Sequence, residues 1–128
     1  MRHLLLASAC LIGTIAIAAG QSHAGRKDPW VAPSSVNARQ NPLANRPETL
    51  AGGHKVFDER CAACHGADGS GGARGPNLMT KRVQDQSDGA LFWKISSGNT
   101  RTGMPSFSFL PEEQRWQLVS QLRTEATR

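Results

Sequence analysis

The stretch CAACH at residues 61–65, in which two cysteines and a histidine follow at fixed spacing, restricts the fold of this chain most strongly. Three kinds of site use such a stretch: a redox-active disulfide, half of a zinc site, and a covalently attached haem. With 128 residues, the chain forms one small domain, whose core stays thin unless a bound group fills part of it. The choice between the three sites therefore also bears on how the domain folds.

The N-terminal segment has the pattern of an export signal. An apolar run over residues 4–19 follows a single arginine and precedes small residues up to position 24. This pattern predicts a secretory signal peptide over residues 1–24, because the run is shorter than the roughly 20 residues that a membrane-spanning helix needs. An uncleaved membrane anchor is the alternative. Export to the periplasm, an oxidising compartment, leaves Cys61 and Cys64 as the cysteines of the mature chain.

The charge of the chain is basic but scattered. The sequence has 15 Lys and Arg against 10 Asp and Glu, a formal net charge of +5, and its basic residues alternate with acids and glycines. Nucleic-acid binding needs a clustered basic face, so we expect no nucleic-acid partner. A basic surface of this kind is suited to steering an acidic protein partner.

Residues 25–47 are rich in Pro, Asn, Ala and Ser and show no apolar period. This composition predicts an extended arm or linker ahead of a domain at residues 48–128. Trp30 is the one large apolar group of the arm. Two interpretations of Trp30 remain open, one in which it pins the arm to the domain and one in which the arm is a mobile tail.

Three segments of the domain have helical spacing. Residues 48–61 place apolar side chains at i, i+3 and i+4. Residues 87–98 begin with a capping serine or aspartate and end at Gly98. Residues 111–128 open with a proline and two acids, which favour a helix start. Since no segment alternates with period two, the predicted fold class is all-α.

The residues that accompany the CAACH motif in the mature chain decide between the three kinds of site. A zinc site needs four ligands, but only His54 and His65 accompany the cysteines, and His65 adjoins Cys64. A redox disulfide belongs at the start of a helix in a βαβ unit, and the strands are missing. Cys-x-x-Cys-His is instead the attachment signature of c-type haem. Each thiol adds to a vinyl group of the porphyrin, and His65 is then held beneath the iron as an axial ligand.

The second axial ligand decides the chemistry, because a six-coordinate iron shuttles electrons while an open one binds gases or peroxide. Met104, in TGMPSF, lies between a glycine and a proline and is the predicted ligand. Met79 is expected to fill core space, and His54 to be an exposed helix residue. A thioether ligand raises the reduction potential relative to two imidazoles.

Four motifs occur in order: GHKVFDERCAACHG, GPNL, DGALFWKISSG, and GMPSF followed by a terminal helix. Together they resemble the monohaem class I cytochromes c, the small all-helical electron carriers of bacterial periplasms and mitochondria. The resemblance covers roughly residues 48–123 and implies a small cytochrome c fold, with three main helices around one covalently attached haem c. The site residues that it implies are thioether bonds at Cys61 and Cys64, iron ligands His65 and Met104, and a carbonyl of Pro76 that orients the His65 ring.

The resemblance also implies that the first and last helices cross closely at Gly53. The family usually places an aromatic side chain of the last helix against this glycine. The chain has Gln121 where such a ring is often found, so Trp116 is expected to take over the packing.

The function that the resemblance implies is periplasmic electron transfer. The donor would be a dehydrogenase or another protein and the acceptor a terminal oxidase or another cytochrome, with the chain either a free carrier or a subunit of such a complex. The chain itself would transform no substrate. The alternative is a haem c enzyme or a gas or redox sensor whose sixth ligand is open or displaceable.

Overall fold

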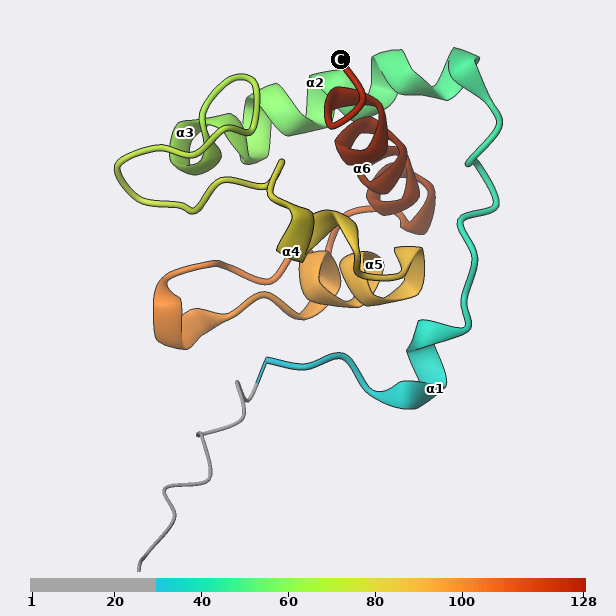
Figure 1. The fold of residues 1–128 in the computed structure, drawn as a ribbon, viewed down its shortest axis with the longest axis horizontal. Coiled ribbons are helices and arrows are strands. Elements are labelled where there is room, and N and C mark those ends of the chain that lie inside the picture. Colours follow the sequence, from blue (N-terminus) through green and yellow to red (C-terminus); the bar gives the residue numbers. More distant parts are fainter. Residues whose placement is uncertain (1–29) are drawn as a thin grey trace, which may run out of the picture.

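The computed structural model describes residues 30–128 (Figure 1), so the predicted signal peptide and the first residues of the arm lie outside the described part. This part contains helices and no strand, with one isolated bridge between Asn99 and Met104. The all-α prediction is therefore confirmed. The elements are α1 Ser34–Asn37, η1 Pro47–Thr49, α2 Leu50–Arg60, α3 Ala62–His65, α4 Lys81–Gln84, α5 Asp88–Ser97, η2 Thr100–Thr102 and α6 Glu112–Glu125.

The three long helices begin and end for reasons that are visible in the sequence. In α5 the Ser87 hydroxyl accepts a hydrogen bond from the Ala90 N–H at 3.1 Å, and Gly98 ends the helix with a φ of 63°. Two acids occupy the first turn of α6 after Pro111. Helix α2 begins two residues later than predicted, because residues 47–49 form a tighter 3₁₀ turn. None of the described helices is long and apolar enough to cross a membrane.

Helices α2 and α6 cross closely at Gly53, as the resemblance implied. A Cβ atom at this position would lie 2.5 Å from the carbonyl oxygen of Gln117 and 3.1 Å from the Cβ of Gln121. Only glycine allows two helix backbones to approach so closely here. The crossing fixes the direction in which α2 runs into the cysteine motif.

The expectation for Trp116 is wrong. Its ring stacks on Phe92 of α5 with the ring centroids 4.0 Å apart, on a different side of α6 from the glycine crossing. The buried Gln121 occupies the crossing instead. Its Nε2 atom donates to Glu125 at 2.8 Å and lies 3.0 Å from Nδ1 of His54. An amide therefore joins α2 to α6 at the place where the resemblance implied an aromatic ring.

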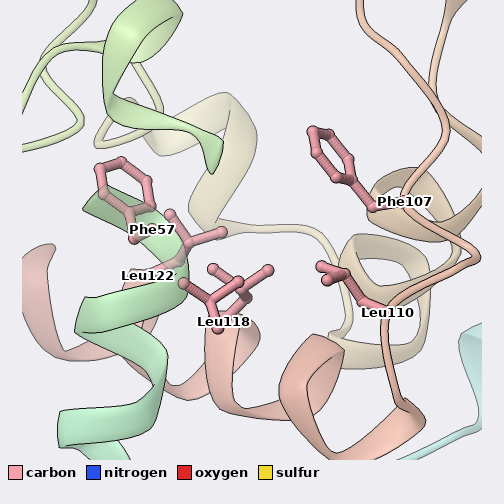
Figure 2. Close-up of a cluster of buried hydrophobic side chains, with 6 residues drawn as sticks. Phe57, Phe107, Leu110, Leu118 and Leu122 are labelled. Atoms are coloured by element: carbon pink, nitrogen blue, oxygen red, sulfur yellow. The ribbon is translucent and has the colours of Figure 1, made fainter. Parts of the chain in front are cut away.

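The core consists of two clusters of buried side chains. One joins α2, α6 and the segment before α6, and partly buried side chains near the cysteine motif pack against it. Figure 2 shows Phe57, Leu118 and Leu122 on one side of this cluster and Phe107 and Leu110 on the other. The other cluster joins α5 to α6 through Leu91, Phe92, Trp116 and Val119.

The described part of the arm, residues 30–47, packs against α5 and α6. Figure 1 shows this segment passing from beneath α5 around to the start of α2. The buried Asn41 donates through Nδ2 to the Trp116 carbonyl at 3.1 Å and to the Ser120 hydroxyl at 2.8 Å. Its own oxygen accepts the Leu43 N–H at 2.9 Å, so every polar atom of this amide is satisfied. Of the two interpretations left open for Trp30, the structure shows the pinned one: its indole N–H donates to the Gly98 carbonyl at 2.7 Å.

Candidate functional site

The cysteine–histidine motif sits at the junction of α2 and α3. Cys61 ends α2, donating its N–H to the Phe57 carbonyl at 2.8 Å, and also precedes α3, which carries Cys64 and His65. The His65 N–H donates back to the Cys61 carbonyl at 3.0 Å, which closes the turn. Both cysteines are free and partly buried. One short turn therefore presents two thiols and an imidazole together.

The His65 ring is oriented by a backbone carbonyl. Its Nδ1 atom lies 2.9 Å from the carbonyl oxygen of Pro76, which is the contact that the resemblance implied. A carbonyl can only accept a hydrogen bond, so Nδ1 must carry the hydrogen. The lone pair of the ring is then on Nε2, and this nitrogen is available to a metal ion.

The glycine-rich loop at residues 66–77 brings Pro76 to this position. The Gly71 N–H donates to the His65 carbonyl and the Leu78 N–H to the Gly69 carbonyl, both at 2.8 Å. The backbone at Gly75 passes so close that a Cβ atom there would lie 2.9 Å from Nδ1 of His65. The loop therefore contacts the imidazole through its backbone, at Gly75 and Pro76.

Met104 lies in the connection between α5 and α6. The Asn99 N–H donates to the Met104 carbonyl at 2.9 Å, and the Met104 N–H donates to the Asn99 carbonyl at 3.1 Å. Met104 is half-buried and packs against the same core cluster as Cys61. The fold thus brings the predicted ligand and the cysteine motif, which are far apart in the sequence, to one apolar cluster.

The two alternative ligands have other surroundings. Met79 also packs against this cluster, but its side chain lies against the glycine-rich loop: a Cβ at Gly69 would be 2.7 Å from its methyl carbon. The His54 ring faces α6, with Nε2 3.6 Å from Glu125. Of the three candidates, Met104 alone comes from the segment between α5 and α6.

Sequence analysis did not single out Arg123, which holds the segment after Met79 in place. Its guanidinium donates to the carbonyls of Gln84, at 2.6 Å, and Gln86, at 2.5 Å, and to the carboxylate of Asp88 at 2.9 Å. These bonds join α6 to α4 and to the start of α5. An isolated arginine in a polar C-terminal helix has no pattern that would reveal such partners.

The Cys61 thiol does not have the environment of a redox-active cysteine. Burial and, to a lesser extent, the neighbouring Cys64 together raise the pKa of Cys61 to about 11. Redox-active cysteines have lowered pKa values, so this thiol lacks their defining property. Within residues 30–128, no three His, Cys, Asp or Glu side chains are grouped so that they could hold a metal ion.

The same residues fit a haem. Two thiols and an imidazole share one turn, the imidazole has Nε2 available, and Cys61 packs with other partly buried apolar side chains against one core cluster. Covalent attachment uses neutral thiols that add to vinyl groups, so the high pKa of Cys61 is compatible with it. Cys61, Cys64 and His65 would hold the group, which supplies an iron that changes oxidation state by one electron.

Comparison with known proteins gives the same result. The sequence model of the family described as cytochrome c oxidase, cbb3-type, subunit III, matches residues 48–120. Cytochrome CL of the marine methylotrophic bacterium Methylophaga aminisulfidivorans superposes with a TM-score of 0.60 at 23% identity, covering 73% of this chain and 68% of that one. The c-type cytochrome XoxG of Methylobacterium extorquens AM1 gives 0.54 at 23% identity, covering 61% of this chain and 50% of XoxG. At this identity both structures establish the fold alone.

The search of curated proteins found no match. The family match covers more than half of the chain and includes the whole of the cysteine–histidine motif. The chain therefore belongs to the cbb3-type subunit III family of cytochrome c domains, and is a small c-type cytochrome with one covalently bound haem c.

Proposed function

We propose that His65 and Met104 are the two axial ligands of the haem iron and that the protein is a dedicated electron carrier. The observation that supports this assignment is the placement of Met104 and Cys61 on one core cluster, with the Met104 backbone bonded to Asn99. His65 is pre-oriented by Pro76, so its ring loses little freedom on binding iron. A thioether stabilises the reduced iron and raises the potential.

The proposed setting is the periplasm, reached through removal of residues 1–24, with the arm at 25–47 and the cytochrome domain at 48–128. The donor is a dehydrogenase or another redox protein, and the acceptor is a terminal oxidase or another cytochrome. The family description names an oxidase subunit, which supports a role as a dedicated subunit as well as a free carrier. The chain transforms no substrate, and it contacts the membrane only if the signal segment is retained.

The test is the optical spectrum of three holoproteins: wild type, Met104→Ala and the control Met79→Ala. We expect a low-spin ferric wild type with the weak long-wavelength sulfur-to-iron band and no carbon monoxide binding to the ferrous form. Met104→Ala should lose the band, bind carbon monoxide and have a lower potential, because the thioether is gone. Met79→Ala should keep the band.

Two outcomes would contradict the proposal. If Met79→Ala loses the band while Met104→Ala keeps it, Met79 is the ligand. If the wild type is high-spin and binds carbon monoxide, the sixth position is open. The enzyme or sensor interpretation would then replace the electron carrier.

A further inference from the structure

We infer that Trp30 of the arm is a positioning residue for the Met104 ligand loop. The contact between them runs through a single peptide group, the one that joins Gly98 to Asn99. The inference rests on the proposed ligation by Met104, because positioning matters to the iron only if this side chain binds it. The arm would then act as part of the redox site rather than as a tether.

The Gly98–Asn99 peptide is held at both ends. Its oxygen accepts the indole N–H of Trp30 at 2.7 Å, and its N–H donates to the Met104 carbonyl at 2.9 Å. Because a peptide group is planar, its oxygen and its N–H cannot turn independently. Trp30 therefore restrains the hydrogen bond that fixes the backbone of Met104. The Ser97 hydroxyl also donates to the Gly98 oxygen, at the longer distance of 3.3 Å.

The same glycine is in direct contact with the residue after the ligand. A Cβ atom at Gly98 would collide with the carbonyl group of Pro105, and the positive φ of 63° independently favours glycine. Beyond Pro105, the Ser106 hydroxyl donates to the Ser96 carbonyl at 2.6 Å. The loop thus closes onto the last turn of α5, at the place where Trp30 binds.

Trp30 is itself held from two sides. The ammonium group of Lys94 lies 4.5 Å from the centre of its ring, a cation–π contact from the last turn of α5. Behind it the arm is docked, with Ala32 buried and the backbone of Val36 against Gly89. The indole therefore reaches Gly98 from an ordered segment, so little entropy is lost in making the bond.

The expected effect follows from the usual net contribution of one hydrogen bond. Removal of the indole N–H should favour local opening of the loop by about twofold to tenfold. Because Lys94 and the arm remain, global unfolding should change less than the loop does.

The experiment uses holoprotein Trp30→Phe, which keeps an aromatic ring for Lys94 and removes the N–H donor together with one ring of the indole. The control is Val31→Ala, at a neighbouring arm residue that is 65% exposed. Hydrogen exchange is measured at the Asn99 and Met104 amides, with the buried Val119 amide of α6 as an internal reference. The sulfur-to-iron band and the helix signal are followed together through a denaturant titration.

We expect both loop amides to exchange about twofold to tenfold faster in Trp30→Phe, with Val119 unchanged. The band should disappear at a lower denaturant concentration than the helix signal, while Val31→Ala resembles wild type. Unchanged exchange at the two amides would overturn the inference, and so would an equal acceleration at Val119, which indicates a loss of global stability alone. A wild type without the band would overturn the Met104 ligation itself. The amide exchange would still report separately whether Trp30 braces the loop.

Discussion

The crossing of α2 and α6 and the docked arm stabilise the same domain in different ways. At the crossing, two helix backbones meet at Gly53 beside an apolar cluster. The arm also buries Ala32 and approaches Gly89 closely, but it adds bonds from individual polar groups: Asn41 and Trp30 donate to backbone carbonyls of the helix region, and Arg39 donates to the carboxylate of Glu112. The fit between two helix backbones thus governs the crossing. The attachment of the arm depends more on individual hydrogen bonds. Substitutions in the two regions should consequently destabilise the protein for different reasons.

The largest effect is expected at the crossing. Gly53→Ala should lower the free energy of unfolding by about 3 kcal/mol, because the added methyl meets the backbone of Gln117, which cannot move without shifting α6. The measurement is denaturant unfolding of the holoprotein. The matched control is Gly52→Ala, whose methyl would meet only the flexible end of the Gln117 side chain.

We expect Gly52→Ala to be neutral or to stabilise the protein by up to about 1 kcal/mol, since alanine is the better helix former. Equal losses for the two variants would mean that the crossing is not limited by backbone contact at Gly53. If only Gly52→Ala lowers the free energy of unfolding, the helices approach most closely at Gly52 and not at Gly53.

The next effect concerns the arm. Asn41→Ala should cost about 2 kcal/mol, because it removes two buried donors and leaves the Leu43 N–H without its partner. Asn45→Ala, an exposed amide on the same segment, is the control and should be nearly silent. If the two variants unfold alike, the arm contributes little to the stability of the domain.

This contrast also explains which parts were predictable from the sequence. The three long helices followed from apolar spacing and caps, and the cysteine–histidine motif fixed the cofactor, because both signals are local. The sequence showed that Gln121 stands where the family often has an aromatic ring. The contact of its amide with His54 could not be predicted, because it depends on how α2 and α6 cross. The arm has no period at all, so its order depends on partners in α5 and α6 that no local pattern specifies.

Met104 and Trp116 show, for single residues, what could and could not be predicted from the sequence. Met104 was predicted from its place between Gly103 and Pro105, and the fold then brought it to the cluster of Cys61. Trp116 was assigned to the glycine crossing because Gln121 occupies the place where the family often has a ring. Trp116 and Gln121 are five positions apart and therefore lie on different sides of α6, and the packing of α5 against α6 then brings the Trp116 ring onto Phe92.

The smallest effect should come from the exposed ion pair that joins the arm to α6, and it should depend on pH. Hydrogen bonds from Trp116 and then Arg39 lower the pKa of Glu112. A group with a lowered folded pKa stabilises the protein above its unfolded pKa, about 4.3 for glutamate, and this stabilisation is lost as the pH falls through the folded value. Glu112→Gln should therefore shift the denaturant midpoint slightly at pH 7 and by less at pH 3. The adjacent Glu113→Gln is the control, and high salt should shrink the pH 7 difference.

A difference that persists unchanged at pH 3 would mean that the Glu112 charge does not hold the arm, and that neutral contacts such as those of Asn41 hold it instead.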